Sequence, residues 1–137
     1  MSEEWNHASW VSTFGKWAWV LVIINAIIDI IWGLYIIIIF TGIPYLEAPG
    51  IWLLIGGIIN ALIAFFIILP KFSIKCGNKD WDYLLNWVIP LGSLRFPWML
   101  FWGIILEIFG YGWGGLPVLI PTIFLLFAGP KPYNWST

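Results

Sequence analysis

The chain is organised by four long apolar stretches separated by short polar segments. The stretches cover residues 17–40, 50–69, 84–109 and 116–129. Each is almost continuously apolar, whereas a strand of a membrane barrel alternates apolar and polar residues over ~10 positions. Because a bilayer-spanning helix needs ~20 apolar residues, the pattern predicts four transmembrane helices and not strands.

The third stretch is interrupted by two prolines and a glycine, and it contains Arg95. If its helix begins at Leu84, Arg95 lies about 16 Å deep, where an arginine costs at least ~2.5 kcal/mol. If the helix begins near Phe96, Arg95 stays at the cytoplasmic interface. We favour the second arrangement because Pro97 then occupies the first turn, where its missing N–H does no harm. Residues 81–94 would then form an interfacial or re-entrant segment.

The N-terminal segment carries Trp10, Phe14 and Trp17 at helical spacing. This spacing predicts an amphipathic helix that lies in the membrane interface. The competing interpretation is a disordered polar tail, because Ser12 and Gly15 are poor helix formers.

Basic residues give the predicted bundle an orientation. All of them fall on one side of it, and these interfacial basic positions are Lys16, Lys71, Lys75, Lys79, Arg95 and Lys131. Positive residues are retained in the cytoplasm, so we expect both termini and the 70–80 loop to be cytoplasmic. The expected location is the plasma membrane, as a multi-pass protein, and the isoleucine-rich run at 36–39 favours a prokaryotic source.

These expectations give an all-α integral membrane fold, a four-helix transmembrane bundle built as two hairpins. Its segments are a cytoplasmic interfacial segment (1–16), a first hairpin (17–69), a cytoplasmic loop with an interfacial or re-entrant part (70–95), a second hairpin (96–130) and a cytoplasmic tail (131–137). Each half contains a basic residue, a span with one acid and a closing Pro-Lys, in the same order. This order fits a tandem duplication, and it also fits chance matches in a composition so rich in Trp, Pro and Ile.

Composition agrees with a membrane location. The 137 residues are 61% hydrophobic and only 9% charged, with 12 Trp, whereas soluble domains are about a quarter charged. A soluble enzyme and a nucleic-acid binder are therefore excluded. A single His and a single Cys, Cys76, provide too few ligands for zinc, haem or an iron–sulfur cluster, so we expect no metal site and no cofactor. We expect Cys76 to be an unremarkable thiol in a cytoplasmic loop.

Four polar residues fall at a similar depth inside the predicted spans. Measured from the lysines at about 1.5 Å per residue, Asp29 lies about 19 Å deep, Glu107 about 18 Å and Asn60 about 16 Å, with Asn25 slightly lower. One hypothesis is an intramembrane site with two carboxylates that takes up a proton or a cation. The alternatives are a set of hydrogen bonds that only join helices, and an ion pair of Asp29 with a deeply placed Arg95.

No nucleophile–base set, phosphate loop or metal motif occurs in the sequence, so we expect no enzymatic activity. The predicted function is that of a structural, scaffold or accessory subunit that associates laterally with itself or with other membrane subunits in the lipid bilayer. The alternative is a small oligomeric transporter or channel coupled to protons or cations, using Asp29 and Glu107. A weaker alternative is binding of anionic headgroups by the lysine loop.

Overall fold

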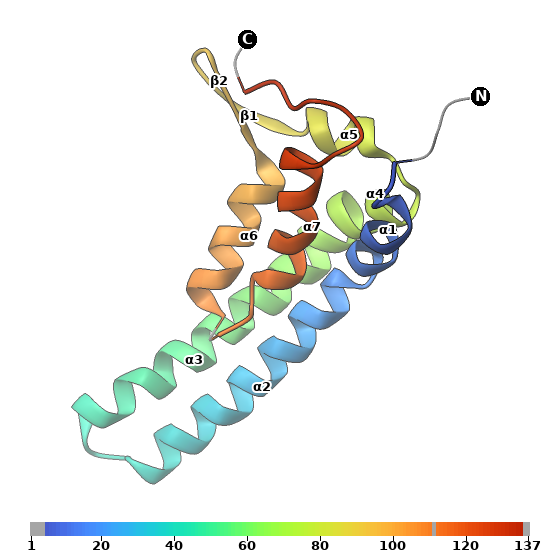
Figure 1. The fold of residues 1–137 in the computed structure, drawn as a ribbon. Helices are drawn as coiled ribbons and strands as arrows, with labels where there is room; N and C mark the ends of the chain where they lie inside the picture. The colour runs from blue at the N-terminus through green and yellow to red at the C-terminus, as the bar shows by residue number, and fades with distance from the viewer. Residues whose placement is uncertain (1–4, 111, 136–137) are drawn as a thin grey trace.

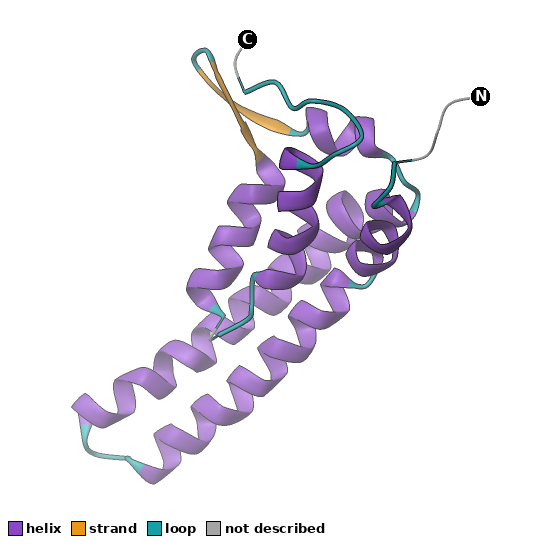
Figure 2. Ribbon diagram, in the orientation of Figure 1, coloured by secondary structure: helices purple, strands orange, loops and turns teal. Residues whose placement is uncertain are grey.

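The computed structural model describes residues 5–110 and 112–135. It is mostly helical, at 73%, and its only two described strands form one small hairpin (Figure 2). Two helices are long and apolar enough to cross a membrane, and two shorter apolar helices accompany them. The predicted all-α class is consistent with this architecture.

The two longest helices form an antiparallel hairpin whose connection lies at one end of the molecule (Figure 1). They are α2 (Ala18–Ile39) and α3 (Pro44–Ile63). A Cβ atom added to Gly33 would lie 2.6 Å from the main-chain oxygen of Gly50, and one added to Gly57 would lie 2.8 Å from that of Ala26. Only glycine fits at such contacts, so the two helices pack very closely.

Helix α3 continues beyond the predicted end of its apolar stretch. It passes into a π-helical segment, η1 (Ala64–Ser73), and then into the short α4 (Ile74–Gly77). Pro70 lies inside η1. Proline lacks an N–H, and its ring disrupts regular α-helical hydrogen bonding. Pro70 therefore explains why the helix changes from α-helical to π-helical winding in this segment.

The second hairpin consists of α6 (Trp98–Phe109) and α7 (Leu116–Phe127), each of 12 residues. At 1.5 Å per residue each helix is about 18 Å long. The sequence predicts eighteen-residue helical legs from Trp113 to Arg95 and to Lys131, each about 27 Å long. The structure differs because residues 94–97 are extended and residues 128–131 are not helical.

Residues 81–97 contain a short helix and a β-hairpin, where the sequence predicts an interfacial or re-entrant segment and no strand. Helix α5 (Trp81–Asn86) is followed by β1 (Val88–Leu91) and β2 (Leu94–Pro97), which pair antiparallel. Gly92 has φ +65° in the two-residue connection. Such short connections need positive φ, which glycine adopts without strain.

The predicted N-terminal helix is present as α1 (Ala8–Lys16). Residues 1–4 of the expected 1–16 segment lie outside the described residues. The predicted aromatic face is not the face that packs inward, because Trp17 is 51% exposed and Trp10 is 36% exposed. The small residues of the helix are buried instead: Ala8, Val11, Ser12 and Gly15.

The main hydrophobic core lies at the end of the molecule that contains both described chain ends (Figure 1). Its largest fully buried side chains include Phe72, Ile68, Leu84 and Met99. Among the described residues, no buried member of this core comes from between Val22 and Ala64. The core therefore joins α1, η1, α4, α5, α6 and α7 to the inner parts of the long hairpin only.

Candidate functional site

The turn between α6 and α7 meets the long hairpin part-way along its length (Figure 1). Asn60, on α3, is completely buried and donates its side-chain Nδ2 to the main-chain oxygen of Leu106 at 2.9 Å. The amide of Gly110 donates to the same oxygen at 2.7 Å. Asn60 Oδ1 has no hydrogen-bond partner among the described residues. The buried side-chain amide of Asn60 thus connects α3 to the end of α6.

Helix α2 presents its own polar residues to this turn. Asn25 and Asp29 are four residues apart on one helix face, and they are 1% and 3% exposed. Asn25 Oδ1 lies 2.9 Å from the position that a Cβ atom on Gly114 would occupy, and a Cβ on Gly110 would lie 2.8 Å from Asn60 Nδ2. The two turn glycines therefore leave room for the two asparagines.

Glu107 has a different local role from the one that its depth suggested. Its Oε1 accepts a hydrogen bond of 3.0 Å from the main-chain N–H of Gly115, the N-cap residue of α7. A carboxylate at this end of a helix satisfies an otherwise unpaired N–H and faces the positive end of the helix dipole. Glu107 is partly exposed and closes its own hairpin.

The four predicted intramembrane residues thus lie around or near one hairpin turn. Asn25 is seven residues after the first residue of α2, about 10 Å along it. A Cβ atom on Gly56 would contact the main-chain oxygen of Phe109, and Gly56 is twelve residues from the outer end of α3, about 18 Å away. Buried amides and carboxylates of this kind can hold helices together, bind water or a cation, or share a proton.

The basic residues gather at the opposite end from the α2–α3 connection. Lys75 lies 4.0 Å from Asp80 and 4.6 Å above the ring of Tyr83. Lys131 pairs with Asp82 of α5. Two of the predicted interfacial lysines are therefore matched by acids of the same segment.

Arg95 lies on β2 and is held by the chain end and by the last residue of α5. Its guanidinium donates to the main-chain oxygen of Asn134 and to Asn86 Oδ1, both at 3.2 Å. Its main-chain oxygen accepts from the hydroxyl of Tyr133 at 2.7 Å, and burial raises the pKa of that hydroxyl. The first residue of α6 is Trp98, which agrees with the helix start near residue 96 and not with a helix from Leu84.

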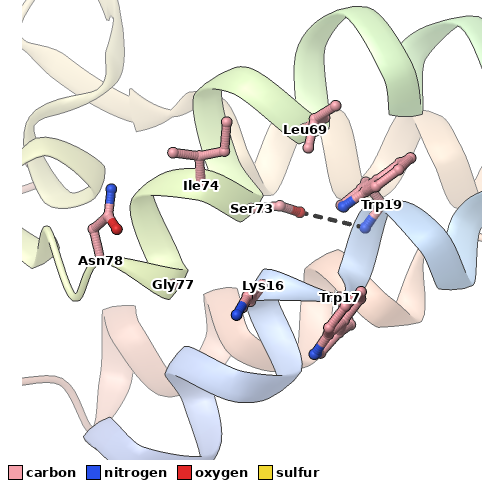
Figure 3. A pocket seen from close by; sticks show the side chains of 8 residues that line it. All are labelled: Lys16, Trp17, Trp19, Leu69, Ser73, Ile74, Gly77 and Asn78. Carbon is pink, nitrogen blue, oxygen red and sulfur yellow. Dashed lines mark hydrogen bonds between the residues drawn. The ribbon is translucent and has the colours of Figure 1, made fainter.

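A shallow pocket opens at the same end, beside the junction of α1 and α2 (Figure 3). Trp17 and Lys16 form one side of it, and Ser73 and Asn78 lie across from them. The hydroxyl of Ser73 accepts a 3.3 Å hydrogen bond from the main-chain N–H of Trp19, which ties the base of α2 to η1. Aromatic rings beside a lysine are typical of a membrane–water interface.

The sequence predicts that Cys76 lies in a loop, but the structure places it on a helix. It is completely buried on α4, against α1. A Cβ atom on Gly15 would lie 2.6 Å from its Sγ. Cys76 therefore packs as a small apolar side chain, and glycine at position 15 makes the space for it.

Sequence reasoning missed the roles of the turn glycines and of the β-hairpin. Among the residues that the structure describes, no three His, Cys, Asp or Glu side chains form a group that could hold a metal ion. No protein-family model matches the chain, and no curated protein or solved structure is detectably similar to it.

Proposed function

We propose that the chain is an integral membrane protein in which α2 and α3 cross the bilayer and the α6–α7 hairpin enters only part of it. The hydrocarbon core is ~30 Å thick, and α2, with 22 residues, is about 33 Å long. Helices α6 and α7 have 12 residues each, about 18 Å, which is too short to cross. The lysine-rich end is cytoplasmic, so the short hairpin is re-entrant from that side.

This arrangement replaces four full spans with two spans and one re-entrant hairpin. The hydrogen bond from Asn60 to the end of α6 and the close approach of Asn25 to Gly114 support it, because non-helical backbone at membrane depth must be buried in protein or line a water-filled cavity. The tight glycine contacts between α2 and α3 also suit a lipid environment, where close packing holds helices together.

We propose further that the protein is a non-enzymatic structural or accessory subunit that associates laterally in the plasma membrane. The observation that carries this proposal is the exposure of Gly112 and Trp113 in the α6–α7 turn. An irregular turn does not remain exposed to lipid inside the hydrocarbon layer. A second copy or another membrane subunit that covers this turn would complete the structure.

Cross-linking in the native membrane tests this assembly. Trp113→Cys is compared with Ile38→Cys, whose side chain is 71% exposed on the outer part of α2. Native Cys76 is completely buried and gives the background. We expect a cross-linked species with the W113C variant and none with I38C, and a particle larger than one chain in mild detergent. A monomeric particle without cross-links at position 113 would contradict lateral association.

A second candidate function is proton- or cation-coupled transport by an oligomer. The buried Asp29 and the unsatisfied Oδ1 of Asn60 near a glycine-rich turn favour it, because broken helices form ion sites near the middle of the membrane. Asp29→Asn and Glu107→Gln separate the two functions. Both amides still form hydrogen bonds, so assembly should survive, whereas a pH-driven flux in liposomes should disappear if the protein is a transporter.

A further inference from the structure

The elements that pack around α2 and α3 are distributed unevenly along these two helices. The outer limit of the packed region is the α6–α7 turn, which contacts Asn25, Gly56 and Asn60. Beyond it, α2 and α3 continue alone to their connection (Figure 1). We call this part, residues 30–51, the narrow end, and the part that holds the core and the basic residues the wide end.

The wide end contains several packed elements besides α2 and α3. Figure 1 shows α6 and α7 beside the inner part of the long hairpin, and α1, α4 and α5 at its inner end. Their buried residues form one continuous core, which includes Val11, Phe72, Leu84 and Leu125. This end therefore has a cross-section of several helices.

The narrow end has a cross-section of two helices in close contact. A Cβ on Gly50 would lie 2.8 Å from the main-chain oxygen of Gly33, so the helix axes approach as closely as backbone atoms permit. Large apolar side chains cover the outside, with Ile38 71% exposed and Trp32 54% exposed. These side chains are suited to contact with acyl chains.

The direction of this taper relative to the membrane follows from charge. All the lysines and Arg95 belong to the wide end, and none lies in residues 30–51. In the topology proposed above the wide end thus occupies the cytoplasmic half of the bilayer and the narrow end the outer half.

We propose that this taper makes the protein a sensor and stabiliser of membrane curvature, with the cytoplasmic leaflet on the convex side. A body that displaces more lipid area in one leaflet than in the other is best accommodated where the first leaflet is expanded by bending. The proposal rests on the re-entrant topology proposed above. A neighbour that covers only the α6–α7 turn leaves the taper in place, because the outer parts of α2 and α3 stay uncovered.

The test asks whether copies inserted in opposite orientations are enriched in, or depleted from, a curved membrane tube. The chain is reconstituted in giant vesicles of phosphatidylcholine with phosphatidylglycerol, from which a thin tube is pulled outward. Asn78→Cys reports the wide end and Thr41→Cys reports the narrow end, and both positions are exposed. A membrane-impermeant maleimide dye added outside labels only the copies whose reporter faces outward, while native Cys76 is completely buried.

Copies labelled at N78C should be enriched in the tube relative to the vesicle, with a ratio above one. Copies labelled at T41C have the reverse orientation and should be depleted, with a ratio below one. Equal ratios for the two variants would overturn the proposal.

Two further readouts keep the outcomes distinct. Trp17→Ser in the N78C background removes an exposed aromatic side chain at the end of α1. If the taper causes the enrichment in the tube, this variant should still be enriched. Loss of the enrichment would show that α1 causes the sorting, and it would overturn the proposal. If dye added outside labels every copy of both variants, positions 78 and 41 do not lie on opposite sides of the membrane, and the proposed topology is wrong. Equal ratios with one-sided labelling leave that topology intact and reject the taper alone.

Discussion

Asn60 on α3 donates its side-chain Nδ2 to the main-chain oxygen of Leu106 on α6 at 2.9 Å. Both groups are buried, and the same oxygen accepts the N–H of Gly110 as α6 ends. One amide therefore attaches the end of the short hairpin to the long one. This attachment fixes how far the α6–α7 turn reaches along α3.

Asn60→Leu should weaken the attachment of the short hairpin. The substitution removes a buried donor but keeps a similar volume, and interhelical polar contacts in membranes contribute ~0.6 kcal/mol on average and at most ~1.7 kcal/mol. We expect a loss in this range, measured by reversible unfolding in mixed detergent micelles. Ile58→Leu, at a 46% exposed position of the same helix, is the control and should change stability little. Equal stability of N60L and the wild type would show that the contact contributes nothing.

Gly33→Ala should be strongly destabilising although alanine favours helices. Its Cβ would lie 2.6 Å from the main-chain oxygen of Gly50 and 2.8 Å from the amide nitrogen of Leu54, and neither backbone atom can move aside easily. Overpacking of this kind costs about 1–3 kcal/mol. In Gly77→Ala the nearest atom is the flexible Lys16 Cγ at 3.2 Å, so the loss should be much smaller. Similar stabilities for the two variants would contradict the close packing of α2 and α3.

Much of the fold follows from the sequence, but its dimensions do not. Continuous apolar sequence predicts α2 and α3, and α6 and α7 arise from stretches of the same kind. The length of the second hairpin could not be predicted, because Arg95 and Pro97 lie in an extended strand that apolar periodicity does not distinguish from helix. The Gly92-Ser93 pair between two short apolar runs was the signal for the β-hairpin.

In the candidate site, Asn25 and Asn60, for which the rise per residue predicts a similar depth, lie close to the same turn. The hydrogen-bond partner of Glu107 could not be predicted from the rise per residue. Its hydrogen bond to Gly115 depends on the path of the turn, and spacing along the helix does not determine that path.

Glu107→Gln should be tolerated, whereas Glu107→Leu should not. The amide oxygen of glutamine can still accept the Gly115 N–H, while leucine leaves that N–H without its acceptor at the start of α7. We expect E107L to lower stability by about 1 kcal/mol relative to E107Q, a typical value for one hydrogen bond. The comparison uses the same unfolding measurement, and an equal loss in the two variants would indicate that charge, and not hydrogen bonding, is the important property.

The chain end should respond to alkaline pH. Burial raises the pKa of Tyr133 above the usual value of about 10, although Arg95 partly opposes this effect. A raised folded-state pKa stabilises the fold fully below the unfolded value, and this contribution is lost as pH rises through the folded pKa. Ultraviolet titration should show a tyrosine that ionises above the usual tyrosine pKa, and this step should be missing in Tyr133→Phe. An unchanged titration curve in that variant would contradict the assignment.

The depth of the α6–α7 turn in the bilayer distinguishes two spans with a re-entrant hairpin from four full spans. A spin label on Trp113→Cys in reconstituted bilayers is compared with labels on Thr41→Cys and Asn78→Cys, using collisions with oxygen and with a water-soluble nickel complex. A re-entrant hairpin whose turn is covered inside the bilayer predicts low nickel accessibility for the label at position 113, while the other two labels lie near opposite surfaces and have high nickel accessibility. A label at position 113 that matches the one at position 41 would instead place the turn at the outer surface and establish four full spans.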